Sequence, residues 1–167
     1  SSAASDVYKR QDVLTMFLAL DSYVELFGGG RISMEEFSKR KADRDILVNI
    51  IVKKHAQRSV YLSQRNASTD FPVLACAVCL DEEGMRLSIG ARPGRAVLMK
   101  EAAETPVNNE NMSPEEWNSQ AELLAEKAAE SITTGSNMRA SKEYRTHLVR
   151  VLAKRALLAA GGMGNGN

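Results

Sequence analysis

The stretch FPVLACAVCLDEEGMRLSIGA, from Phe71 to Ala91, joins two apolar segments through a polar turn. Phe71–Leu80 is apolar at both odd and even positions, which is typical of a central strand covered on both faces. Asp81–Gly84 supplies the turn, and the following segment alternates. The alternation predicts an inner face and an outer face, with Met85, Leu87 and Ile89 inward and Arg86 and Ser88 outward. The stretch therefore predicts an antiparallel pair of strands.

Further elements flank this pair on both sides. SVYLSQRN (Ser59–Asn66) is expected to form another strand, whereas RPGRAVLMKEAAE (Arg92–Glu104) is expected to lead into a helix. Ser113 predicts the start of a long helix, because a serine N-cap is followed by a proline and a capping glutamate. Ser141 predicts a second start. The inward stripes expected on the two helices are Trp117, Ala121, Leu124, Ala128 and Ile132, then Tyr144, Leu148, Val151 and Leu152.

The N-terminal part predicts a separate small unit. Asp12–Ser22 has the spacing of a short buried helix, and a hairpin follows from Tyr23 around three glycines. A short helix is capped at Ser33, and the β-branched run Ile46–Lys54 predicts a strand. The fold class is therefore α+β, in two pieces. We divide the chain into residues 12–56, a small sheet backed by long helices over residues 57–160, and a flexible glycine-rich tail over residues 161–167.

The first eleven residues, SSAASDVYKRQ (Ser1–Gln11), show no pattern of helix or strand. They resemble the translation of a transposon-end adapter used in sequencing libraries. We therefore expect a non-native segment, with native protein from Asp12 and a gene cut off upstream.

Composition excludes several classes of protein. Setting aside Lys9, Arg10 and Asp6 from 22 basic and 21 acidic residues leaves 20 of each, which argues against a nucleic-acid binder driven by bulk charge. No apolar run approaches the roughly 20 residues that cross a bilayer, so no membrane partner is expected. Two cysteines and no signal sequence predict a reduced, cytoplasmic protein.

The residues that could carry chemistry by themselves are few. Cys76 and Cys79 form C-x-x-C, but residues three apart on a strand point to opposite faces, so two buried apolar thiols are expected rather than a metal site. His55 and His147 lie on unrelated elements. The glycine runs are interpreted as turns. The basic residues of the last helix could follow phosphates, although a solvated or partner-facing surface is favoured: Lys142, Arg145, Arg150, Lys154 and Arg155.

One segment resembles a known family. GSNMRASKEYRTHLVRVLAKRAL (Gly135–Leu157) is similar to the closing motif D-x-R-A-S-x-x-Y-R-x-x-L-x-x-x-L-x-x-R-A-L of the FAD-binding subunits of molybdenum hydroxylases, such as the carbon monoxide dehydrogenase medium subunit and the xanthine dehydrogenase FAD subunit. Asn137 stands where the motif has an acid. IGARPGRA (Ile89–Ala96) resembles the family's G-G-x-x-P-x-R-A turn. The matching positions of the helix are Arg139, Ala140, Ser141, Tyr144, Arg145, Leu148, Leu152, Arg155, Ala156 and Leu157.

The resemblance implies an end of an FAD-binding α+β domain at residues 12–56, followed by a three-stranded antiparallel sheet packed on a helical bundle. DVLTMFLALDS resembles the family's S-D-L-x-x-x-L-L-A-L-D-A, which places Asp12 on an aspartate that contacts FAD. Leu47 falls on an apolar position that lines the flavin. Relatives often carry a lysine near the flavin where this chain has Val60 or Leu62. The resemblance implies no acid, base or nucleophile in this chain.

The implied function is electron relay by an FAD-dependent oxidoreductase subunit. Substrate is oxidised at a molybdopterin cofactor on a large partner subunit, and electrons pass through [2Fe–2S] clusters on a small partner subunit to FAD, then to an acceptor such as NAD⁺. This chain alone is expected to be inactive, because the glycine-rich loops that hold the pyrophosphate in the family are not in it. The alternative is a non-catalytic subunit-docking module that does not bind flavin.

Overall fold

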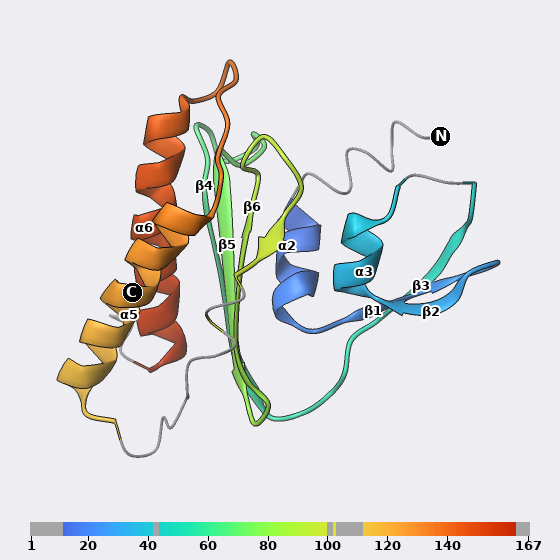
Figure 1. Ribbon diagram of the computed structural model, residues 1–167, viewed down its shortest axis with the longest axis horizontal. Coiled ribbons are helices and arrows are strands. Elements are labelled where there is room, and N and C mark those ends of the chain that lie inside the picture. The colour runs from blue at the N-terminus through green and yellow to red at the C-terminus, as the bar shows by residue number, and fades with distance from the viewer. Residues whose placement is uncertain (1–11, 42–43, 100–101, 103–111, 163–167) are drawn as a thin grey trace.

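The computed structural model describes residues 12–41, 44–99, 102 and 112–162. Within them the chain forms two antiparallel sheets and four helices longer than one turn, in the α+β class that the sequence predicts. A three-stranded sheet with order β2-β1-β3 lies on one side of the molecule, and a four-stranded sheet with order β4-β5-β6-β7 lies at its centre (Figure 1).

The four-stranded sheet contains the stretch from which the sequence analysis began. Its strands are β4 (Gln57–Gln64), β5 (Leu74–Asp81), β6 (Gly84–Gly90) and the two-residue β7 (Val97–Leu98). β5 is central and almost entirely buried, which confirms the prediction of a doubly covered strand. β7 pairs with β6 within the segment Arg92–Glu104 that the sequence predicted to lead into a helix, and this short strand was not foreseen. Ala102 is helical, and the rest of the expected helix lies outside the described residues.

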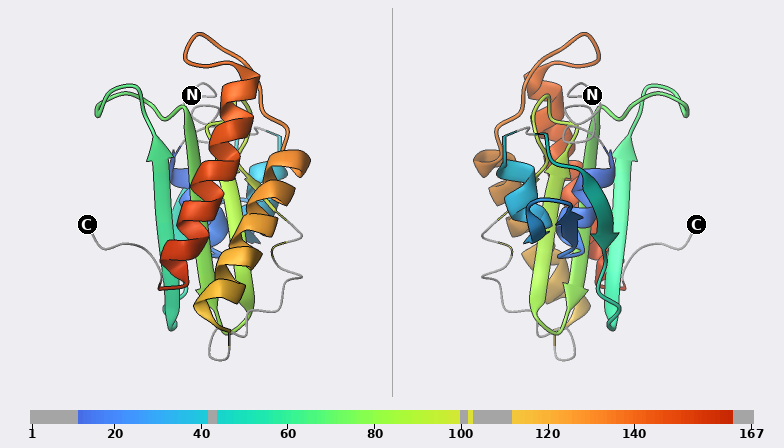
Figure 2. Two further views of the ribbon diagram at one scale, coloured as in Figure 1. Left: turned by 90° about the vertical axis from the view of Figure 1, so that its left-hand side faces the viewer. Right: turned by 90° about the vertical axis from the view of Figure 1, so that its right-hand side faces the viewer.

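Two long antiparallel helices cover one face of this sheet (Figure 2). α5 (Pro114–Ser131) and α6 (Lys142–Ala160) begin at the predicted caps, where Ser113 and Ser141 accept hydrogen bonds from backbone amides. The α5 stripe is buried as predicted. On α6 the prediction holds for Leu148 and Leu152, whereas Val151 is only partly buried. It was wrong at Tyr144, which is exposed while its neighbour Arg145 is buried. The guanidinium of Arg145 donates hydrogen bonds to acceptors inside the fold, whereas the Tyr144 side chain stays in contact with solvent.

α2 (Asp12–Ala19) covers the opposite face of β5 and β6 (Figure 1). Ser88 is fully buried there and donates a 2.5 Å hydrogen bond to the carbonyl of Thr15. Arg86 donates a 3.1 Å hydrogen bond from Nε to the carbonyl of Ala19. The outward face predicted for β6 therefore meets a helix instead of solvent, which explains why its polar groups need partners.

The N-terminal unit is a hairpin, a short helix and a third strand. β1 (Tyr23–Leu26) and β2 (Gly30–Ser33) form the predicted hairpin, α3 (Met34–Lys39) follows, and β3 (Leu47–Ile51) pairs with β1. Side chains of β1 pack against α2 and α3 in a small core of their own. β3, by contrast, exposes nearly all of its side chains. None of the helices in the described part of the chain combines the length and the apolar composition that a membrane-spanning helix requires.

Candidate functional site

Two residues were predicted to contact a flavin, and both lie in the N-terminal unit. Asp12 is the first residue of α2, but its side chain lies outside the described part of the structure, so its role stays a prediction. Leu47 begins β3 and pairs with Leu26 of β1. Because directly paired residues share a face, Leu47 lies on the face where Leu26 packs on the helices. It remains 42 % exposed.

β3 and the residues that flank it expose aliphatic side chains on both faces of the strand. The side chains of Ile46, Val48, Ile50 and Val52 are also more than a third exposed. An exposed run of branched aliphatic residues is unusual on a water-facing strand and marks a surface that another group covers. An aliphatic surface of this kind can pack against a flat aromatic ring.

The described residues provide no cradle for a pyrophosphate. Such cradles place backbone amides at the start of a helix after a glycine-rich turn. Here Gly28–Gly30 joins two strands of a hairpin, as the sequence predicted. The described residues therefore fit the apolar part of a flavin nucleotide and leave its phosphates without amide donors.

The positions where relatives carry a lysine face away from the N-terminal unit. Val60 and Leu62 pack against the core between the sheet and the long helices. Tyr61 lies on the opposite face of β4, where it lines a small apolar pocket with Met16 and Leu20. The pocket encloses about 140 Å³.

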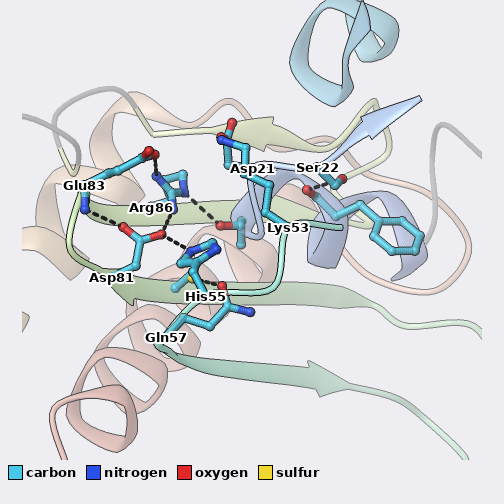
Figure 3. Close-up of polar contacts among 11 residues, drawn as sticks. Asp21, Ser22, Lys53, His55, Gln57, Asp81, Glu83 and Arg86 are labelled. Carbon is cyan, nitrogen blue, oxygen red and sulfur yellow. Dashed lines mark hydrogen bonds and ion pairs between the residues drawn. The ribbon is translucent and has the colours of Figure 1, made fainter. Parts of the chain in front are cut away.

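A polar cluster connects the two sheets, and Figure 3 shows its members. The carboxylate of Asp81, at the end of β5, lies between His55 and Arg86. His55 comes from the segment that joins β3 to β4, and its Nε2 lies 2.9 Å from Asp81 Oδ2. Arg86 of β6 contacts the same oxygen. The backbone amide of Glu83 donates a 2.9 Å hydrogen bond to the other oxygen, Oδ1.

These contacts determine the charge state of Asp81. Burial alone would raise the pKa of its carboxyl, but the hydrogen bond with His55 and the charge of Arg86 outweigh burial, so the pKa is lowered. The carboxylate is thus held as an anion with its acceptors occupied. A second ion pair, Lys53 Nζ to Asp21 Oδ2 at 2.8 Å, fixes the joining segment to the end of α2. We call the contacts of Asp81 with His55 and Arg86 the Asp81 clamp, because they join the segment before β4 to the end of β5 and to β6.

The two cysteines occupy opposite faces of β5, as predicted. Cys76 belongs to the core under α5 and α6, and Cys79 lies with Ala19 and Ala77 on the face toward α2. Burial raises the pKa of the Cys76 thiol to about 12, so it stays protonated. The Cys79 thiol donates to Gln57 Oε1 at 3.3 Å. Both are free thiols, and among the described residues no three metal-ligating side chains group together.

The basic residues of α6 mostly face partners within the chain. Arg150 Nε lies 2.5 Å from Glu126 Oε1, and Lys154 Nζ lies 3.3 Å from Glu122 Oε2, both on α5. These ion pairs engage Arg150 and Lys154, two of the five basic residues that could have bound phosphates.

Sequence reasoning missed the role of Arg145. Its guanidinium donates to the backbone carbonyls of Val73, Gly135 and Ala140 at 3.0, 2.7 and 2.7 Å. A fourth hydrogen bond, 2.6 Å long, reaches Oδ1 of Asn137. The available signal was the family motif itself, which has an arginine at this position and an acid at the position of Asn137.

Comparisons with known proteins agree with this arrangement. The model of the CO dehydrogenase flavoprotein C-terminal domain family matches residues 59–160, more than half of the chain. No curated protein sequence matches the chain.

Solved structures share the fold at low sequence identity. Quinoline 2-oxidoreductase from Pseudomonas putida 86 aligns over 96 % of this chain and 61 % of its own, with 17 % identity and a TM-score of 0.75. Carbon monoxide dehydrogenase from Hydrogenophaga pseudoflava, in a form that lacks the Mo-pyranopterin moiety of the molybdenum cofactor, aligns over 96 % and 60 %, with 18 % identity and a TM-score of 0.76. The chain thus spans about 60 % of the length of these two chains. By its sequence match and its fold, it belongs to the family of the CO dehydrogenase flavoprotein C-terminal domain, in agreement with its resemblance to the FAD subunits of molybdenum hydroxylases.

Proposed function

We propose that this chain is part of the FAD-binding electron-transfer subunit of a molybdenum hydroxylase complex. The family match over residues 59–160 carries the proposal. The exposed aliphatic residues of β3 support it, because in this proposal another part of the FAD-binding domain, or the flavin itself, packs against them. The solved chains of this fold are longer than this one, which leaves room for such a domain.

In this proposal residues 12–56 belong to the FAD-binding domain and residues 57–160 to the C-terminal domain. FAD, when bound, supplies the redox chemistry between [2Fe–2S] clusters on a small subunit and an acceptor such as NAD⁺. Leu47 presents an apolar surface to the flavin ring. Asp12 accepts hydrogen bonds from ribose or adenine donors. The molybdopterin belongs to a large partner subunit, and the complex acts in the cytoplasm.

The chain's own residues contribute surface and position, since no described side chain is poised as a nucleophile or general base. Cys76 is protonated within the core, and Asp81 is held by His55 and Arg86. This arrangement agrees with a subunit whose cofactor does the chemistry.

Flavin binding tests the proposal. The native protein, expressed from the intact gene, is expected to purify with visible flavin absorbance at one FAD per chain. The 167-residue chain is expected to bind FAD weakly or not at all, because its described residues lack amide donors for the phosphates. A colourless native protein that takes up no added FAD would contradict the proposal and favour the alternative, a docking module without flavin.

A further inference from the structure

The two candidate flavin contacts lie on elements that are tied together at their other ends. Asp12 is the first residue of α2, which ends at Ala19. Leu47 is the first residue of β3, which ends at Ile51. The chain that leaves each element enters the polar cluster beside the hairpin of β5 and β6 (Figure 3). One group of side chains therefore holds the ends of both elements.

The end of α2 is held to the hairpin by Arg86 of β6. Its Nε donates a 3.1 Å hydrogen bond to the carbonyl of Ala19. Carbonyls in the last turn of a helix lack donors within the helix, and the guanidinium supplies one. The same guanidinium contacts Asp81, whose side chain is fully buried. Arg86 thus joins the helix end to the Asp81 clamp.

The segment that leaves β3 is held at two points. Lys53 Nζ lies 2.8 Å from Asp21 Oδ2 and 5.2 Å from the centre of the Tyr23 ring. The hydrogen bond with Asp21 raises the pKa of Lys53, so the ammonium stays charged at neutral pH. Two residues further on, His55 Nε2 lies 2.9 Å from Asp81 Oδ2. The first point ties the segment to the end of α2, and the second ties it to β5.

The backbone fixes Asp21 in place to receive Lys53. Asp21 has a φ of 46°, in the left-handed region that aspartate and asparagine adopt more readily than most residues. The next residue, Ser22, donates a 2.8 Å hydrogen bond from its hydroxyl to the carbonyl of Phe17 in α2. The bend between α2 and β1 is therefore set locally, and the carboxylate of Asp21 projects from a defined position.

We propose that the Asp81 clamp and the Lys53–Asp21 ion pair position the flavin contacts: they hold α2 and β3 in the mutual arrangement in which Asp12 and Leu47 reach the same FAD. The inference rests on the proposed function, which supplies the FAD. None of the clamp and ion-pair residues touches the flavin in this proposal. They act by keeping the contacting residues in place before the cofactor binds, which lowers the ordering entropy that binding costs.

The first measurement uses the 167-residue chain and needs no flavin. Asp21→Asn removes the charge and keeps a residue that tolerates the left-handed backbone. It is expected to speed hydrogen exchange of the amides in β3 and in residues 52–56 by about fivefold. Lys53→Arg, which keeps the charge, should leave these rates unchanged. Unchanged rates in Asp21→Asn would overturn the inference, because the ion pair would then hold nothing.

The control for Asp21→Asn is Asp70→Asn. Asp70 pairs with Arg139 across two loops remote from the N-terminal unit, and its side chain is 32 % exposed against 34 % for Asp21. Asp70→Asn therefore removes a carboxylate of similar exposure without touching α2 or β3. It should leave hydrogen exchange in β3 and in residues 52–56 as it is in the original chain.

The second measurement uses the native protein with FAD. Asp21→Asn and His55→Ala are expected to raise the dissociation constant of FAD by about tenfold and to change the visible circular dichroism of the bound flavin. Lys53→Arg and Asp70→Asn should retain the original values of both. The circular dichroism of the flavin reports its immediate surroundings, so it changes when the contacting residues move and stays constant when only overall stability falls.

The outcomes separate this inference from the proposed function. A native protein that takes up no FAD would overturn both. A native protein that binds FAD, and whose affinity and flavin circular dichroism Asp21→Asn and His55→Ala leave unchanged, would overturn the inference alone. An equal loss of affinity in Asp70→Asn would assign the effect to general stability, against the inference. Far-ultraviolet circular dichroism checks that each variant is folded, and Asp21→Asn keeps the test available if His55→Ala is not.

Discussion

Arg145 donates a 2.6 Å hydrogen bond to Asn137 Oδ1, and among the described residues this buried guanidinium donates only to uncharged acceptors. Burial lowers the pKa of Arg145, with a smaller contribution from nearby Arg139. The family motif carries an acid at position 137. The loop therefore accommodates a buried cation by means of neutral oxygen acceptors, at a position where the motif that this segment resembles has an acid.

Asn137→Asp is expected to stabilise the protein by about 1 kcal/mol, since a carboxylate at this distance forms a charge-assisted hydrogen bond with Arg145. The backbone amide of Arg139 donates to the same Oδ1 at 2.9 Å and would be retained. The new carboxyl would have a lowered pKa in the folded state. Its contribution is thus complete above the unfolded pKa of about 3.9 and is lost as the pH falls through the folded pKa. Urea unfolding at pH 7 and pH 3 measures the gain in unfolding free energy and its dependence on pH. An equal gain at pH 7 and pH 3 would contradict the assignment of the gain to the charge of the new carboxylate.

Gly161 lies where α6 passes the only tryptophan. A Cβ on Gly161 would lie 2.0 Å from Trp117 Nε1, whose N–H donates to the carbonyl of Leu157 at 3.1 Å. Gly161→Ala is expected to destabilise the fold by about 2 kcal/mol through overpacking, and to change the tryptophan fluorescence. Gly94→Ala is the control, since its nearest atoms, in the Arg92 side chain, begin at 3.6 Å. Unaltered stability and fluorescence in Gly161→Ala would show that the helix end can move aside without cost.

The contact of α2 with the central sheet can be tested at Gly90. A Cβ on Gly90 would lie 1.7 Å from Thr15 Oγ1 and 3.1 Å from Thr15 Cβ. Gly90→Ala is therefore expected to displace α2 and to destabilise the protein by about 2 kcal/mol. Thr15 Oγ1 is buried without a hydrogen-bond partner among the described atoms, so Thr15→Ala alone should change stability little.

A double-mutant cycle then decides whether Thr15 is the group displaced. The Gly90→Ala, Thr15→Ala protein should recover part of the loss, and not all of it, because the Cβ of residue 15 stays close. Additive effects measured by urea unfolding would mean that the two residues do not meet. The cycle also reports how strongly the N-terminal unit depends on the C-terminal sheet.

Those elements that could be predicted from the sequence are specified locally. β5 is recognisable because both of its faces are apolar, and the helix starts at Ser113 and Ser141 follow from side chains within three residues. The opposite faces of Cys76 and Cys79 follow from the geometry of one strand.

The features that could not be predicted depend on distant pairs. Ser88 is buried because Thr15, 73 positions away, lies above it, and nothing near Ser88 encodes that neighbour. Arg145 is buried because backbone carbonyls accept its hydrogen bonds, and carbonyls leave no mark on a sequence. The candidate flavin contacts, Asp12 and Leu47, came from resemblance alone. The structure adds that Leu47 lies in an exposed aliphatic strand.

The Asp81 clamp predicts how stability depends on pH. The pKa of Asp81 is lowered in the folded state, so its contribution is complete above the unfolded pKa of about 3.9 and is lost as the pH falls through the folded value. Asp81→Asn is expected to cost about 2 kcal/mol at neutral pH, because Arg86 would remain partly buried beside a neutral group. It should also flatten the loss of stability on acidification below about pH 4. Asp70→Asn is the matched control, since Asp70 is a more exposed carboxylate paired with Arg139 at a longer 3.4 Å. Unfolding free energies of the three proteins at pH 7, 5 and 3 provide the comparison, and an acid dependence that Asp81→Asn leaves as steep as before would assign it to other carboxylates.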